Sequence, residues 1–162
     1  MRKRAILLIY GQGGHRTQMK RLHDHLKPGL ARRGLEVAGI CETGSKLDDI
    51  YSLSQPAVRD KHNRLKLLLT LPLSLVYSAA LVARLVIRYR FVGVISTGPG
   101  IAVVPSVLVK LLGARIIFLE SWSRFETPSM SGKVMYRIAD RFYIQNRKLK
   151  QHFPKALYGG LL

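Results

Sequence analysis

His15 closes a glycine-rich run, Gly11-Gln12-Gly13-Gly14-His15, which directly follows an apolar stretch of the chain. An imidazole titrates near neutral pH, so His15 is a candidate general base for a hydroxyl group. Gly13 and Gly14 let the backbone approach a ligand closely, and a helix that begins after them would point free N–H groups at a phosphate or carboxylate. The run lacks the third glycine of a dinucleotide fingerprint and the Gly-Lys-Ser/Thr of a Walker loop. A plain strand-to-helix turn is the alternative.

A second glycine loop, Ser96-Thr97-Gly98-Pro99-Gly100, follows a later apolar run and precedes another helical pattern. Ligands of open parallel sheets bind at the carboxyl ends of the strands, where such loops gather. We therefore expect both loops to face one cleft, with Thr97, Gly98 and Gly100 in contact with the ligand. For this loop alone, a simple turn is an equally open interpretation.

Glu120 ends a further apolar run in a chain that contains only 9 acidic residues. Together with Ser121, it is predicted to bind substrate hydroxyls or, alternatively, to orient His15. A surface carboxylate paired with Arg124 is the competing interpretation. No metal site is predicted, because the remaining histidines show no ligand spacing with carboxylates. These histidines are His23, His25, His62 and His152.

The elements that must position these residues alternate along the chain. Apolar runs of strand length lack polar alternation, which is typical of strands covered on both faces in a parallel sheet. Apolar residues at helical spacing predict a helix over Thr17–Leu26, which Pro28 should kink or end. A second predicted helix, Pro105–Leu112, should be capped by Gly113. This alternation predicts an α/β, Rossmann-like, doubly wound sheet, with 43–63 left unassigned. The predicted strands are Ala5–Tyr10, Leu35–Ile40, Phe91–Ile95, Ile116–Leu119 and Phe142–Ile144.

Length and charge limit the class of protein. The chain has 162 residues, enough for a single domain over 1–162, and 27 basic residues against 9 acidic ones give a net charge of +18. This charge attracts anions such as phospholipid, phosphorylated substrate or nucleic acid. Cys41 is the single cysteine, which excludes an internal disulfide and indicates a reducing compartment. The basic start at Arg2 mimics a signal peptide, but no cleavage site follows, so a buried first strand is preferred.

The segment 65–87 is the most apolar part of the chain. It contains an uncharged stretch of about 17 residues, the lower limit for crossing a bilayer, with basic residues on both sides. We favour a helix, or a bent helical pair, that lies in the membrane interface and is held by anionic lipid. A core helix kinked at Pro72 is the second interpretation, and a single spanning helix is the third.

The sequence resembles one known family over nearly its whole length, most weakly between Thr43 and Arg90. The resemblance is carried by GQGGHRTQM, by TGPG, by the Glu120-Ser121 pair, by the SxxGK-type segment at Ser129–Lys133 and by the terminal YGG. The family is the membrane-anchoring subunit of the dolichol-linked N-acetylglucosaminyltransferase, together with its bacterial PssD-type exopolysaccharide counterparts.

The resemblance implies the N-terminal half of a GT-B glycosyltransferase, similar to MurG. A separate catalytic subunit would hold most of the UDP-sugar site, and this chain would bind the membrane and a polyprenyl-diphosphate-linked acceptor. The tail 155–162, including Tyr158, Gly159 and Gly160, would dock into that subunit. The expected location is the cytoplasmic face of the membrane, and the expected product is a polysaccharide or glycan.

We therefore expect a membrane-associated glycosyltransferase subunit that needs no cofactor, because the UDP-sugar is its substrate. One alternative is a non-catalytic anchor that only recruits the catalytic subunit. A nucleic-acid-binding protein is a further alternative from the charge, but no aromatic-basic readout motif is present and the apolar 65–87 run fits it poorly.

Overall fold

The computed structural model describes residues 2–56 and 64–162, with side chains in the helix at 64–88 described from residue 72 onward. All pairs of neighbouring strands in its single sheet are parallel, and the strand order is β3-β2-β1-β4-β5-β6-β7. The strands are β1 (Lys3–Tyr10), β2 (Glu36–Glu42), β3 (Tyr51–Gln55), β4 (Tyr89–Ser96), β5 (Arg115–Leu119), β6 (Arg141–Ile144) and β7 (Leu157–Tyr158). The helices are α1 (Gly14–Arg32), α2 (Arg64–Arg88), α3 (Val103–Leu111) and α4 (Met130–Ile138).

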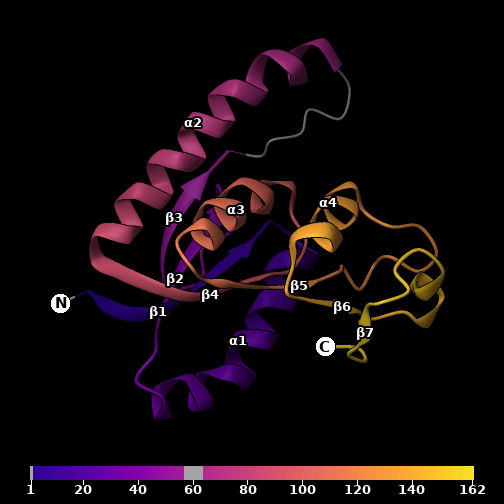
Figure 1. Ribbon diagram of the computed structural model, residues 1–162, viewed down its shortest axis with the longest axis horizontal. Coiled ribbons are helices and arrows are strands. Elements are labelled where there is room, and N and C mark those ends of the chain that lie inside the picture. The colour runs from indigo at the N-terminus through magenta and orange to yellow at the C-terminus, as the bar shows by residue number, and fades with distance from the viewer. Residues whose placement is uncertain (1, 57–63) are drawn as a thin grey trace.

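The helices cover both faces of the sheet, with α1 on one face and α2, α3 and α4 on the other (Figure 1). The chain runs outward from β1 to β3 on one side and from β4 to β7 on the other, so the order of strands reverses between β1 and β4. Register pairs Ile9 of β1 with Ser96 of β4. The two glycine loops therefore leave neighbouring strands at the same edge, where open α/β sheets bind ligands. The predicted doubly wound fold is confirmed.

The core consists of apolar layers on the two faces of the sheet. Fully buried Leu7, Ile9 and Leu85 belong to the layer beneath α2 and α3, whereas Leu8 and Met19 belong to the layer beneath α1. Alternate residues of β1 thus enter opposite layers, which explains why the strand sequences show no polar alternation. A third cluster, built on stacked Phe118 and Phe142, lies beneath α4.

The five predicted strands are all present, but two short edge strands were not predicted. β3 lies in the unassigned region and reads Tyr-Ser-Leu-Ser-Gln, with too few apolar residues to stand out. β7 has only two residues. Helix α1 does not end at Pro28 and continues to Arg32, while α3 ends near Gly113 as predicted, with φ of +92° at that glycine.

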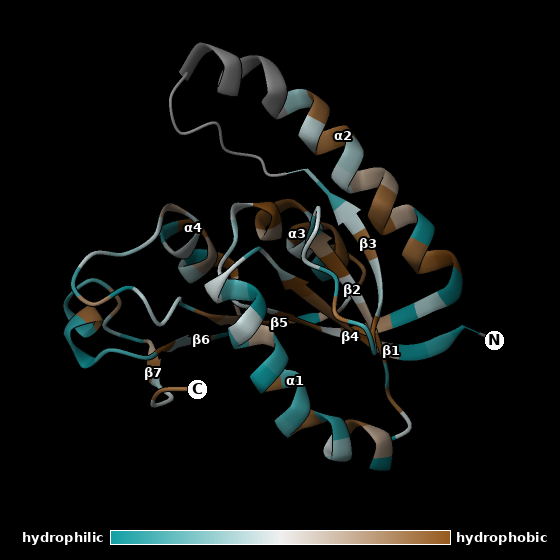
Figure 2. Ribbon diagram, turned by 180° about the vertical axis from the view of Figure 1, so that it is seen from behind, coloured by the Kyte–Doolittle hydropathy of each residue, from teal (hydrophilic) through white to brown (hydrophobic). Residues whose placement is uncertain are grey.

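Helix α2 is one continuous helix that passes through Pro72. Ser78, Val82 and Leu85 are buried against the domain, whereas Leu73 and Val76 are 71% and 68% exposed. Hydrophobic and hydrophilic residues alternate along the described part of the helix (Figure 2). The interpretation as a helix buried within the core is therefore wrong for residues 72–88, where only one face of the helix is covered. Within residues 2–56 and 64–162, no helix has the length and hydropathy needed to cross a membrane.

Candidate functional site

The two glycine loops lie against each other at the carboxyl edge of the sheet. A Cβ atom built on Gly11 would lie 3.0 Å from Cβ of Pro99, and one built on Gly98 would lie 3.2 Å from Cε1 of His15. Gly98 also has φ of +102°, a conformation that favours glycine. Glycine at these points lets the loops approach each other, so they lie together at one edge of the sheet. A ligand site shared by the two loops stays a prediction.

His15 lies in the first turn of α1 and is oriented by the second loop. Its Nδ1 lies 2.5 Å from the carbonyl oxygen of Thr97, and the Thr97 hydroxyl donates to the carbonyl of His15 at 3.0 Å. A carbonyl oxygen can only accept a hydrogen bond, so Nδ1 of the neutral imidazole carries the proton. The lone pair is therefore on Nε2, and His15 presents a basic nitrogen from a half-buried position.

Glu120 is fully buried and forms no surface pair with Arg124. One of its carboxylate oxygens accepts from the N–H of Ser121, and the other accepts from the Ser129 hydroxyl, both at 3.0 Å. Ser129 is the N-cap of α4 and also accepts from the N–H of Gly132 at 2.8 Å. Gly132 has to be glycine, because an added Cβ would lie 1.9 Å from the Glu120 carboxylate. Glu120 therefore fixes the start of α4.

Ser131 connects the start of α4 with the second glycine loop. Its hydroxyl donates to the carbonyl of Gly98 at 2.6 Å. The partner that orients His15 is thus the Thr97 carbonyl, and the Glu120 carboxylate is connected to that loop through Ser129 and the first turn of α4. Sequence reasoning assigned no role to Ser129 or Ser131, although the SxxGK-type segment containing them was part of the resemblance.

A carboxylate also holds the first glycine loop. The backbone N–H of Gln12 donates to the Glu42 carboxylate at 3.0 Å, and the Gln12 side chain donates to the carbonyl of Thr43 at 2.8 Å. A Cβ on Gly11 would lie 2.9 Å from the same Glu42 oxygen. Sequence reasoning missed Glu42. The available signal was its position as the last residue of β2, in a chain with few acids.

The remaining predicted binding residues lie in the same loops with different exposure. Gly13, Gly14 and Gly100 are exposed, while Thr97 and Ser121 are buried. The Ser121 hydroxyl lies 2.9 Å from that of its neighbour Ser123. Gly13, Gly14 and Gly100 are therefore accessible to a ligand, whereas Gly98 is buried like the two hydroxyl residues.

The C-terminal tail folds back onto its own domain. The N–H of Gly159 donates to the carbonyl of Ile144 at 3.0 Å, after the two residues of β7 that pair with β6. Tyr158 lies beneath the guanidinium of Arg147, 4.3 Å from it, and Gly160 turns the chain with φ of +75°. Predicted docking residues Tyr158, Gly159 and Gly160 thus lie at the sheet edge.

Leu162 is connected to the glycine loops through Arg21 and Trp122. Arg21 of α1 donates to the carbonyl oxygen of Leu162 at 3.0 Å, and the N–H of Leu162 donates to Gln145 at 3.1 Å. The guanidinium of Arg21 lies 5.3 Å from the ring centre of Trp122. The Trp122 indole in turn lies 3.1 Å from where a Cβ on Gly14 would be. A protein bound at the tail would therefore be close to the glycine loops.

One group of possible metal ligands occurs among the described residues, away from the glycine loops. His23, Asp24 and Asp49 bring ligand atoms within 4.8 Å of one another. Each carboxylate already pairs with a lysine, Asp24 with Lys20 at 2.8 Å and Asp49 with Lys27 at 3.0 Å. The two lysines supply the positive charge that a cation would bring.

Comparison with solved structures identifies the fold. MurG of Acinetobacter baumannii matches over 88% of this chain with a TM-score of 0.56 and 15% identity. A UGT transferase of Siraitia grosvenorii in complex with UDP matches over 88% with a TM-score of 0.53 and 14% identity. The chain spans 41% and 45% of those proteins. It therefore has the fold of one half of a GT-B glycosyltransferase.

Comparison with known sequences identifies the family. Residues 6–162 match the family described as "Oligosaccharide biosynthesis protein Alg14 like". The human UDP-N-acetylglucosamine transferase subunit ALG14 is 30% identical over 96% of this chain and 82% of its own length. The subunit of the same name from Saccharomyces cerevisiae is 26% identical over 97% of this chain and 76% of its own. The chain belongs to the Alg14-like family of oligosaccharide biosynthesis proteins.

Proposed function

We propose that this chain is the membrane-associated, acceptor-binding subunit of a heteromeric glycosyltransferase. The enzyme would transfer a sugar from a UDP-sugar to a polyprenyl-diphosphate-linked acceptor at the cytoplasmic face of the membrane. Relatives named as subunits of a UDP-N-acetylglucosamine transferase support the reaction class. The GT-B proteins of the same fold are more than twice as long as the matched part, which supports a second protein that completes the cleft.

The observation that carries the proposal is the tautomer of His15. Its Nδ1–H is held by the Thr97 carbonyl, so Nε2 is the nitrogen that accepts a proton. A hydroxyl of the acceptor, bound at the glycine loops, would lose its proton to Nε2 as its oxygen attacks the anomeric carbon of the donor sugar. The bond from that carbon to the UDP oxygen breaks, and UDP leaves with the electron pair.

Glu120 acts in this proposal as a positioning residue. Its buried carboxylate caps the start of α4 through Ser129, and Ser131 of the same turn holds the Gly98 carbonyl. The adjacent Thr97 carbonyl is the group that orients His15. The chain of contacts gives Glu120 an effect on the base although the two side chains do not bond to each other.

Glu42 distinguishes the two loops chemically. It occupies the N–H of Gln12 and adds negative charge to the first loop, so this loop suits sugar hydroxyls, which can donate to a carboxylate. The second loop, with exposed Gly100, is then the better place for the acceptor diphosphate. No metal or cofactor is assigned a step in this mechanism.

Membrane association is proposed for the outer face of α2. Its exposed residues include an apolar stripe with helical spacing: Leu73, Val76, Ala80, Ala83 and Ile87. Arg84 and Arg88 flank the C-terminal part of the stripe and are exposed as well. A helix with an apolar outer face and basic residues at its border is typical of interfacial binding to anionic membranes.

The test is sugar transfer by the complex of this chain with the protein that co-purifies with it from membranes. Replacing His15 with alanine should abolish most of the transfer while the complex still assembles. The alternative is a non-catalytic anchor, and the apolar stripe of α2 is the observation that favours it. This alternative predicts that transfer does not depend on His15. In that case the co-purifying protein alone, given detergent-solubilised acceptor, would reach the full rate, and His15→Ala would turn over normally.

A further inference from the structure

The amino edge of the sheet, opposite the glycine loops, collects a group of exposed arginines. In a parallel sheet covered by helices, the strands begin and the helices end at this edge, so basic residues from both gather there. None of these arginines forms an ion pair in the part of the chain that the structure describes, while Lys3 and Lys110 at the same edge pair with Glu36 and Asp140. The exposed arginines are Arg2, Arg4, Arg32, Arg33, Arg88, Arg90, Arg115, Arg137 and Arg141.

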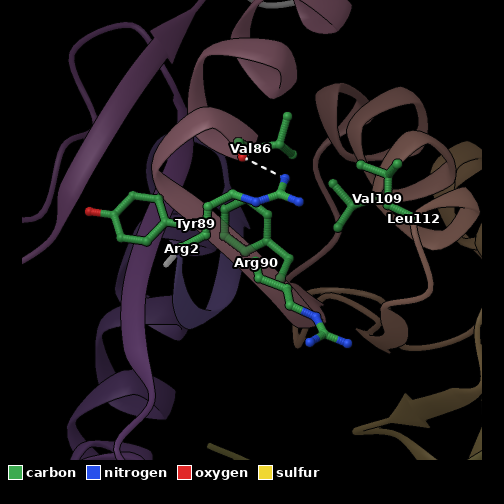
Figure 3. Close-up of a pocket in the computed structure, with 7 residues that line it drawn as sticks. Arg2, Val86, Tyr89, Arg90, Val109 and Leu112 are labelled. Atoms are coloured by element: carbon green, nitrogen blue, oxygen red, sulfur yellow. Dashed lines mark hydrogen bonds between the residues drawn. The ribbon is translucent and has the colours of Figure 1, made fainter.

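Two of these arginines line a pocket of about 130 Å³ between the end of α2 and the end of α3. Arg2 spans the pocket and donates to the carbonyl of Val86 at 3.0 Å. Arg90 also lines the pocket, with its guanidinium directed away from Val86 (Figure 3). Val109 and Leu112 form the opposite wall (Figure 3). Arg2 uses one donor on Val86, so the rest of its guanidinium and that of Arg90 remain available to an anion.

Large aliphatic side chains surround the same corner. Ile87 at the end of α2 is 75% exposed, and Leu111 and Leu112 at the end of α3 are 79% and 63% exposed. Three such residues beside arginines form an apolar surface with a basic border. This combination matches a phospholipid, whose phosphate binds guanidinium groups while its acyl chains cover aliphatic side chains. A nucleic acid would pair with the arginines but would leave the aliphatic residues exposed to water.

We propose that this corner, formed by Arg2, Arg90, Ile87, Leu111 and Leu112, binds the phosphate of an anionic phospholipid in the bilayer surface. The proposal deepens the membrane association of the proposed function. The corner lies at the C-terminal end of the α2 stripe, and Leu73 lies about 21 Å away along the helix, at 1.5 Å per residue. Contact at both ends places α2 parallel to the membrane plane.

The experiment compares binding of the full chain to vesicles of phosphatidylcholine alone and to vesicles that contain phosphatidylglycerol. The variant R2Q/R90Q should bind the anionic vesicles roughly 25-fold more weakly, at about fivefold for each arginine near the surface, with no change on phosphatidylcholine. The matched control R32Q/R33Q removes the same charge at the same edge, but from the end of α1 on the other face. It should change binding less than fivefold.

Three results would overturn the proposal: equal losses in both double variants, no loss in R2Q/R90Q, or loss of RNA binding in R2Q/R90Q with vesicle binding intact. Inorganic phosphate distinguishes a lipid headgroup from a free ion. If R2Q/R90Q weakens the binding of inorganic phosphate in solution but leaves binding to anionic vesicles unchanged, the site takes free phosphate and the lipid proposal fails.

Sugar transfer in detergent separates this proposal from the proposed function. R2Q/R90Q should keep the wild-type rate with a detergent-solubilised acceptor, because the corner lies at the edge opposite the glycine loops. Loss of transfer in R2Q/R90Q with normal vesicle binding would overturn the lipid-binding proposal, whereas loss of transfer in His15→Ala alone bears only on the proposed function. The thermal unfolding midpoints of both double variants should match that of the wild type, which excludes misfolding as the cause.

Discussion

The Nδ1 atom of His15 lies 2.5 Å from the carbonyl oxygen of Thr97, which joins the first turn of α1 to the second glycine loop. This contact fixes which imidazole nitrogen is basic, and it couples two loops that are 82 residues apart in the chain. The position of a candidate base is thus set by the neighbouring strand β4 through its loop. Substitutions in that loop should affect the same step as substitutions of His15.

Replacing His15 with alanine should lower the transfer rate of the assembled complex by about 10²- to 10⁴-fold, because a general base contributes that much. The measurement is sugar transfer at saturating donor and acceptor. His25→Ala is the matched control, since His25 lies on the same helix and is exposed. Equal rates for both variants and the wild type would remove His15 from the chemistry.

Ser131→Ala should reduce the transfer rate about fivefold, the value of one neutral hydrogen bond, because the Gly98 carbonyl loses its partner. Binding of the co-purifying protein should stay normal. The pH dependence of the rate is the diagnostic measurement, since a displaced Thr97 carbonyl changes the environment of His15. Ser54→Ala, which removes a half-buried hydroxyl from β3, serves as the control. An unchanged pH profile in Ser131→Ala would reject a positioning role.

The double variant L73E/V76E should lose most of its binding to anionic vesicles, because two charges would enter the apolar stripe of α2. Vesicle flotation measures the loss directly. Leu161→Glu is a suitable control, since Leu161 is 75% exposed, close to the 71% of Leu73, but lies in the tail. If L73E/V76E floats with vesicles like the wild type, α2 is not the membrane-binding face.

Asp140 should make stability depend on pH at the acidic end. Its carboxylate accepts from the N–H of Ile116 at 2.7 Å and pairs with Lys110 at 3.2 Å, and these contacts hold its pKa below the usual range. A lowered folded-state pKa stabilises the fold above the unfolded-state pKa, and this contribution is lost as pH falls through the folded value.

Asp140→Asn should therefore lower the free energy of unfolding by less than about 1 kcal/mol at pH 7, since the group is partly exposed. The difference from the wild type should shrink below about pH 4, where the unfolded-state carboxyl protonates. Urea unfolding at pH 7 and pH 3 provides the comparison, with exposed Asp48→Asn as control. A difference that stays constant across this range would contradict the lowered pKa of Asp140.

The sheet was predictable because its central strands are apolar on both faces, so Ala5–Tyr10 and Phe91–Ile95 stand out from the chain. β3 was not, since Ser52, Ser54 and Gln55 make its sequence polar. The end of α1 was predicted wrongly at Pro28. This proline is exposed and lies within the helix, which continues to Arg32.

Within the site, residue type identified His15 and the glycines, but not the contacts between them. Pairing of Thr97 with His15 depends on the register of β1 and β4, which no local pattern encodes. Burial of Glu120 beneath α4 depends on Gly132, twelve residues further along the chain. A carboxylate at a strand end therefore suggested direct contact with the base, whereas the fold gives it an indirect connection.

The most direct test is reconstitution of sugar transfer from UDP-N-acetylglucosamine to a short-chain polyprenyl-diphosphate acceptor, in detergent, from separately purified proteins. This chain alone and the co-purifying protein alone should each be inactive, and the mixture should be active, because each supplies one side of the cleft. Turnover by this chain alone, or a full rate from the other protein alone, would contradict a site shared between two proteins.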